Sequence, residues 1–117
     1  MRDKALSELV IELRRFAAER DWEQFHSPKN LAAALAVEAG EVLEHFQWLS
    51  EKDSASLPPE KRDQIGLELA DVLLYLLRLS DRLNIDLLNA AQQKIKLNAE
   101  KYPVERARGT NKKYTEL

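Results

Sequence analysis

The sequence contains no cysteine, only three glycines and four prolines. The lack of cysteine excludes disulfides and thiolate metal sites, and it suits a reducing compartment. Few glycines and few β-branched residues, against many Leu, Ala, Glu, Lys and Arg residues, favour helices over strands. With 117 residues, 44% of them hydrophobic, the chain is expected to form one domain spanning residues 1–117 with a real core.

Long apolar runs are also missing. No uninterrupted apolar stretch reaches the roughly 18 residues of a membrane span, and the opening Met-Arg-Asp-Lys lacks an apolar signal region. We therefore expect no membrane association and a cytoplasmic location. The net charge is only −2, with residues 94–117 net basic and the preceding part net acidic. The basic part is too small and mixed to indicate nucleic-acid binding, and is either a solvated tail or a strip that attracts polyphosphate.

Apolar periodicity predicts four helices, at about residues 3–20, 28–49, 58–83 and 86–102. Ser27 and Asp86 are placed to cap the second and fourth helices, and Pro28 fits the first helical position. Residues 103–117 contain few apolar side chains and are expected to form an extended basic tail. The predicted fold is an antiparallel four-helix bundle of the all-α class.

The predicted third helix is apolar around most of its circumference. A chain of this size can hardly enclose such a helix alone, so the pattern predicts self-association through it. Glu68 and Asp71 lie on its narrow polar stripe, three residues apart, and their carboxylates project side by side. In a helix this buried, the stripe is expected to line a cleft where the two carboxylates need a cation. The polar stripe consists of Gln64, Glu68, Asp71, Tyr75, Arg78 and Arg82.

The predicted second helix carries a matching pair, Glu38 and Glu41, in an apolar surround, with Trp48 expected to continue their stripe. An antiparallel hairpin of the second and third helices can bring the two acid pairs face to face. Carboxylate oxygens without cysteine ligands describe a site for a hard cation, so Mg²⁺ is favoured, with Mn²⁺ as a substitute. The predicted metal ligands and catalytic residues are Glu38, Glu41, Glu68 and Asp71.

These paired acids resemble the metal motif of the all-α nucleoside triphosphate pyrophosphohydrolases, the MazG-like superfamily. Residues 16–26, 38–48, 68–75 and 112–117 resemble its dCTP pyrophosphatase branch in particular. The resemblance implies Mg²⁺-dependent attack of water on the α-phosphorus of a (deoxy)nucleoside triphosphate, dCTP or a modified dCTP, releasing monophosphate and pyrophosphate. Such an activity sanitises the nucleotide pool. The resemblance also implies a homo-oligomer, a tetramer in preference to a dimer, with sites formed between subunits.

The resemblance further implies which residues bind the nucleotide. The two Trp rings would form the pocket for the base with His26 beside it, and Tyr75 would contact the sugar or its neighbourhood. Some members of the branch carry His three residues before the Phe that matches Phe16, where this chain has Leu13. A structural role remains an alternative for each Trp, as core, and for His26, as a loop residue. The implied substrate-binding residues are Trp22, His26, Trp48, Tyr75, Lys94 and Asn98.

Three other interpretations remain open. The chain could hydrolyse another or a broader range of nucleoside triphosphates. It could instead be a non-catalytic helical oligomerisation module with solvated acid stripes. A di-iron carboxylate bundle is the third, but it expects two Glu-x-x-His motifs within helices, and the sequence offers only Glu23-Gln-Phe-His26, at a helix start.

Overall fold

The computed structural model describes residues 3–117, and this part of the chain forms helices without any strand. The predicted all-α class is therefore confirmed. The four main helices are α1 (Lys4–Glu19), α2 (Pro28–Glu44), α4 (Pro59–Arg82) and α5 (Leu87–Lys101). The shorter elements are the helices α3 (Glu51–Ser54) and α6 (Val104–Ala107) and the 3-10 turns η1 (Glu23–Phe25) and η2 (Tyr114–Glu116). Within the described residues, no helix is both long enough and apolar enough to cross a membrane.

The helix starts follow from local capping. The Ser27 hydroxyl accepts the backbone N–H of Asn30, and the Asp86 carboxylate accepts that of Asn89. These bonds satisfy backbone donors that the first helical turn leaves unpaired. Both predicted caps are confirmed. Between α4 and α5, Asn84 adopts a left-handed conformation with φ of 55°, which ends one helix before the next begins.

Helix α2 ends at Glu44 instead of continuing to about residue 49, so this predicted boundary is wrong. Beyond it the backbone N–H groups of Phe46 and Leu49 bond to carbonyls three residues earlier, which tightens the chain into turns. Ser50 then caps α3. Trp48 consequently lies in a turn and does not continue the acid stripe of α2. The tail expected to be extended contains α6 and η2.

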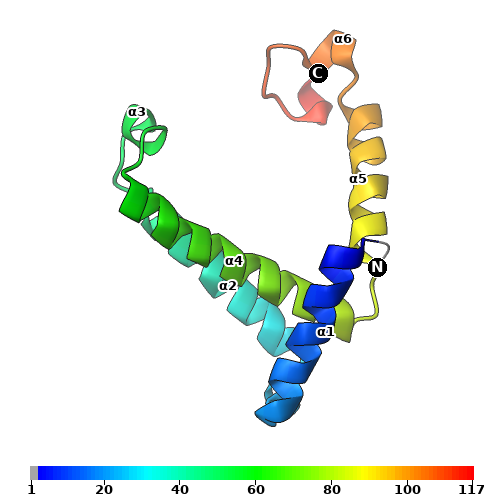
Figure 1. Ribbon diagram of the computed structural model, residues 1–117. Coiled ribbons are helices and arrows are strands. Elements are labelled where there is room, and N and C mark those ends of the chain that lie inside the picture. Colours follow the sequence, from blue (N-terminus) through cyan, green and yellow to red (C-terminus); the bar gives the residue numbers. More distant parts are fainter. Residues whose placement is uncertain (1–2) are drawn as a thin grey trace.

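Helices α2 and α4 form the structural centre. They run side by side in opposite directions as a long hairpin with α3 at its tip, and α1 crosses the hairpin near the end of α4 (Figure 1). The fully buried Leu31 of α2 and Leu77 of α4 belong to the small core of this arrangement. The antiparallel hairpin predicted from the sequence is therefore present, and it determines where the acidic side chains meet.

Helix α5 projects away from the other three helices and carries α6 at its far end (Figure 1). The radius of gyration is 17.7 Å, whereas a compact chain of this length has about 13 Å. Large apolar side chains remain uncovered, including Leu67 of α4 (72% exposed) and Ile95 of α5 (69% exposed). The single chain thus leaves the predicted four-helix bundle open, and its closure stays a prediction.

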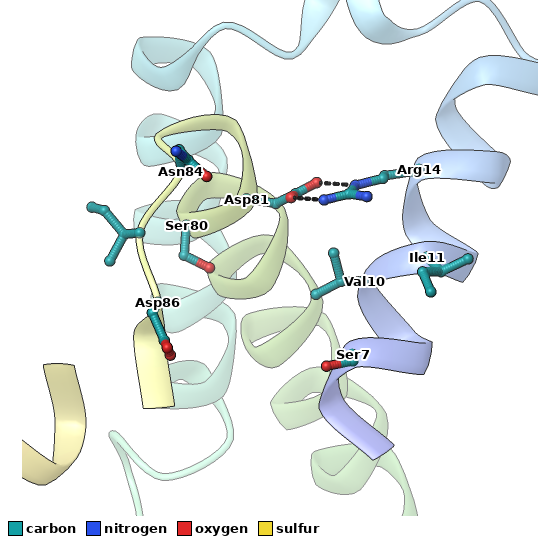
Figure 2. A pocket seen from close by; sticks show the side chains of 9 residues that line it. Ser7, Val10, Ile11, Arg14, Ser80, Asp81, Asn84 and Asp86 are labelled. Atoms are coloured by element: carbon teal, nitrogen blue, oxygen red, sulfur yellow. Dashed lines mark hydrogen bonds and ion pairs between the residues drawn. The ribbon is translucent and has the colours of Figure 1, made fainter. Parts of the chain in front are cut away.

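An ion pair fastens α1 to the end of α4. Arg14 donates from Nε and Nη2 to the two carboxylate oxygens of Asp81, with 2.8 Å between Nε and Oδ2. Figure 2 shows this pair at one side of a pocket of about 310 Å³ between α1 and the α4–α5 turn. The hydrogen bonds and the positive charge of Arg14 outweigh burial and lower the pKa of Asp81, with Arg78 and Arg82 adding to the effect. The ionised carboxylate of Asp81 therefore helps to hold α1 against the end of α4.

Replacing Asp81 by Asn should lower the free energy of unfolding by about 1 kcal/mol at pH 7, because Arg14 is largely solvent-exposed and screening limits the pair. A lowered folded-state pKa contributes stability above the unfolded value and loses it as the pH falls through the folded value. The difference between Asp81→Asn and the unsubstituted protein should therefore shrink below about pH 4. Urea unfolding across this pH range measures it. Glu8→Gln, in the exposed Lys4–Glu8 pair, is the control with little expected change; an equal loss at all pH values would contradict the ion-pair explanation.

Candidate functional site

The hairpin brings three of the four predicted metal ligands together. Glu38 and Glu41 lie three residues apart on one face of α2, and Glu68 faces them from α4. Carboxylate oxygens of these three residues lie within 4.8 Å of one another, and all three side chains are half-buried. We call these three residues the acidic cluster. Antiparallel packing of two helices that each present an acidic stripe produces it.

Asp71 lies one turn after Glu68 on α4, outside this 4.8 Å group and more exposed. It lines a neighbouring cavity. Its negative charge still reaches the cluster, since it contributes to the raised pKa of Glu38. Asp71 therefore stands between the acidic cluster and the cavity.

Glu38 shows the electrostatic cost of this arrangement. Burial is the largest cause that raises the pKa of Glu38, followed by the adjacent carboxyl of Glu41 and the charges of Asp71 and Glu68. Its Oε2 atom is buried and has no hydrogen-bond partner among the described residues. A buried oxygen without a donor, surrounded by like charges, is unfavourable unless a cation neutralises it. The residues present therefore fit a hard divalent cation with oxygen ligands.

His45 is a neighbour of the cluster that the sequence reasoning missed. It follows Glu41 by four residues at the end of α2, and its Nε2 lies 3.7 Å from Oε1 of Glu68. Both side chains are largely shielded from solvent, at 16% and 27% exposure. The spacing from Glu41 would have been the available sequence signal. The contact links the end of α2 to the α4 acid.

A cavity of about 410 Å³ opens beside Asp71, between α1 and α4. It brings together Trp22, His26 and Tyr75, which the sequence resemblance placed at the nucleotide. Leu13 also lines it. The complete lining consists of Leu9, Glu12, Leu13, Phe16, Trp22, His26, Asp71, Leu74, Tyr75 and Arg78.

Aromatic rings form one wall of this cavity. Trp22 makes an edge contact with Phe16, at 5.6 Å between ring centroids, and another with His26, at 6.3 Å. The guanidinium of Arg20 covers the Phe16 ring at 3.6 Å. Trp22 remains 43% exposed, so part of its ring is free to meet a ligand. A flat aromatic surface of this kind accepts a planar ring by stacking.

Arg78 and Arg82 of α4 donate hydrogen bonds to His26. The sequence placed both arginines on the polar stripe of this helix. Arg78 is only 5% exposed and donates from Nε to Nδ1 of His26 at 3.2 Å. Arg82 donates from Nε to the backbone carbonyl of His26 at 3.1 Å. Their contacts were not predicted, although their spacing from Tyr75 on the stripe was visible in the sequence.

Three predicted substrate-binding residues lie away from this cavity within the single chain. Trp48 is 88% exposed in the turn after α2. Lys94 and Asn98 are exposed on α5, which projects away from the hairpin (Figure 1). Their roles at a nucleotide therefore stay predictions.

Comparison with known proteins identifies the sequence class. The chain is 48% identical over 104 residues to dCTP pyrophosphatase 1 of Mus musculus and 46% identical to that of Homo sapiens. Each alignment covers 87% of this chain, but the chain spans only 61% of the length of these curated relatives. The structure is similar to that of a pyrophosphatase from Archaeoglobus fulgidus DSM 4304, with a TM-score of 0.81 and 36% identity, covering 88% of this chain and 96% of the other.

The described helices therefore have the arrangement of a known pyrophosphatase chain along nearly its whole length. The sequence of residues 33–117, which includes all four predicted metal ligands, matches the MazG-like family. The resemblance inferred from the paired acids and the aromatic stretches is confirmed. The chain belongs to the MazG-like family.

Proposed function

We propose that this protein hydrolyses dCTP, or a modified dCTP, to the monophosphate and pyrophosphate. The observation that carries the proposal is that the aromatic cavity adjoins the acidic cluster. Asp71 lines the cavity and lies one helical turn from Glu68 of the cluster. A nucleotide with its base in the cavity would extend its phosphates toward the carboxylates. The similarity to dCTP pyrophosphatase 1 supports the choice of base and sugar.

The acidic cluster and Asp71 would hold Mg²⁺, with Mn²⁺ as a substitute. A bound cation would neutralise phosphate oxygens and lower the pKa of an attacking water. The protein's part is to fix the carboxylates before the substrate arrives. Glu38 and Glu41 are fixed by their position on α2, and the buried Oε2 of Glu38 has no other partner among the described residues.

The nucleotide would use residues of more than one chain. Trp22, His26 and Tyr75 line the cavity of one copy. Lys94 and Asn98 would come from another copy, because no residue of α5 lines the cavity of its own chain, and Trp48 would do the same because it lies outside this lining. We propose a homo-oligomer, a tetramer in preference to a dimer, in which α5 of one chain completes the four-helix bundle of another. A cytoplasmic location suits an enzyme of the nucleotide pool.

A broader range of triphosphates is the alternative function. Leu13 gives the cavity wall an apolar side chain where some members of the branch carry His, which removes one polar contact. A non-catalytic oligomerisation module would account for the exposed apolar side chains, but not for acids that converge beside a cavity. The di-iron interpretation loses support, because the histidine of the Glu23-Gln-Phe-His26 motif is engaged by Arg78.

A panel of nucleoside triphosphates tests the proposal. With Mg²⁺, dCTP and 5-methyl-dCTP should yield the monophosphate and pyrophosphate, and excess EDTA should stop the reaction. Chromatography of the nucleotide products together with a pyrophosphate assay provides the measurement. Equal rates across the panel would favour the broader range, whereas release of orthophosphate, or no turnover at all, would overturn the proposal.

A further inference from the structure

The side chain of His26 lies between a buried arginine and the cavity. Arg78 donates from Nε to Nδ1 of His26, so the Nδ1 atom must act as an acceptor. His26 also lines the cavity next to Trp22, with their rings in an edge contact. No hydrogen bond to Nε2 of His26 is present among the described residues, and this atom is not buried. In the neutral ring the remaining proton therefore resides on Nε2.

Burial and the surrounding charges both favour the neutral form of the ring. Burial is the main cause that lowers the pKa of His26, and the charges of Arg78 and Arg82 lower it further. Glu23 of η1 acts in the opposite direction but is the weakest of these influences. The cavity wall also contains the carboxylates of Glu12 and Asp71.

The backbone of His26 is fixed independently of its ring. Arg82 donates to the carbonyl of His26, and Ser27 begins α2 directly after it. Arg82 therefore holds the segment, whereas Arg78 acts on the ring itself. This difference provides a matched pair of arginines for an experiment.

We propose that Arg78 is a positioning residue that holds His26 as an Nε2–H donor, and that this donor selects a base with an acceptor at the facing ring position. The inference rests on the proposed function and deepens it. Cytosine presents two adjacent acceptors, N3 and O2, along its base-pairing edge, which we take to face His26. Uracil and thymine carry N–H at position 3, which would place two donors against each other and leave both without an acceptor.

Nitrogen-15 NMR of the histidine rings tests the first half in the unsubstituted protein, without requiring any variant to fold. At pH 7 the resonances of His26 should show a pyridine-like Nδ1 and a protonated Nε2, and the ring should titrate below the ordinary pKa of about 6.5. Arg78→Met should mix the two tautomers and raise the pKa of His26. Arg82→Met should leave the tautomer unchanged. A ring protonated on Nδ1, or doubly protonated at pH 7, would overturn the proposal.

Base selection tests the second half. In Arg78→Met, the ratio of kcat/KM for dCTP to that for dUTP should fall about tenfold, mainly through KM for dCTP. In a His26→Ala background the same substitution should leave this ratio unchanged, because the donor is already lost. An equal fall in both backgrounds, or an unchanged ratio in Arg78→Met alone, would show that Arg78 does not act through His26. Arg78→Leu, which also lacks a donor, serves if the Met variant unfolds; the same fall is expected, and an unchanged ratio counts against the proposal.

The two proposals can fail separately. If no triphosphate is hydrolysed, binding of the non-hydrolysable analogue dCMPNPP still measures base recognition. Its binding should shift the His26 Nε2 resonance and slow exchange of the attached proton, and dUMPNPP should bind about tenfold more weakly. Binding without any change at His26 would overturn the inference while leaving the hydrolytic function to be decided by the panel.

Discussion

Replacement of Glu41 by Gln is expected to lower the rate of dCTP hydrolysis by a factor on the order of 10³ or more, with the fold intact. The amide preserves the shape of the side chain but removes one of three carboxylates that lie within 4.8 Å of one another. Since Glu41 raises the pKa of the half-buried Glu38, its neutralisation also relieves repulsion in the metal-free protein. The variant should therefore lose activity without losing stability.

Thermal unfolding with and without Mg²⁺ separates these effects. Without the cation, Glu41→Gln should unfold at the same temperature as the unsubstituted protein or a higher one. With Mg²⁺, the unsubstituted protein should be stabilised because the cation binds only the folded state, and the variant should gain little. Glu44→Gln is the matched control on the same helix, since Glu44 is exposed and belongs to no cluster. Normal pyrophosphate release by Glu41→Gln would remove the acidic cluster from the mechanism.

The predictable part of the fold depends on local rules. Ser27 and Asp86 identify two helix starts because a capping side chain acts on a backbone N–H three residues away. Glu38 and Glu41 share a helix face because of the helical period, and the hairpin then places them opposite Glu68. The acidic cluster could be predicted because each step requires only spacing along the chain and one antiparallel contact.

The parts that sequence reasoning missed depend on contacts between distant residues. Arg78 and His26 are 52 positions apart, and nothing in the local pattern indicates that the ring of one accepts from the other. His45 meets Glu68 across the hairpin, 23 positions further along the chain. The early end of α2 also moved Trp48 into a turn. Helix α5 was predicted correctly as an element, but periodicity does not reveal that its Ile95 stays exposed in the single chain.

The second large effect concerns sites shared between chains. We expect Asn98→Ala to be nearly inactive, like Glu41→Gln, while mixed oligomers of the two variants recover turnover. Asn98 is exposed on α5, which projects away from the acidic cluster of its own chain (Figure 1). If Asn98 serves the cluster of a neighbour, a mixed pair contains one site with both substitutions and one site with neither. Random mixing into symmetric pairs then restores roughly a quarter of the full activity.

Co-expression of the two variants with different affinity tags, followed by tandem purification, isolates the mixed oligomers. In a dimer that carries both tags the recovery should rise to about half, since each such pair contains one intact site; in a tetramer the recovery is lower, because some pairs contain a single variant. The double variant Glu41→Gln/Asn98→Ala, co-expressed with the unsubstituted chain, is the matched control. If sites are shared, each of its mixed pairs has two sites with one defect each and should be nearly inactive. If each chain instead forms its own site, the control should be half active and the mixture of the two single variants should be nearly inactive. Shared and unshared sites therefore predict opposite results for the same two substitutions.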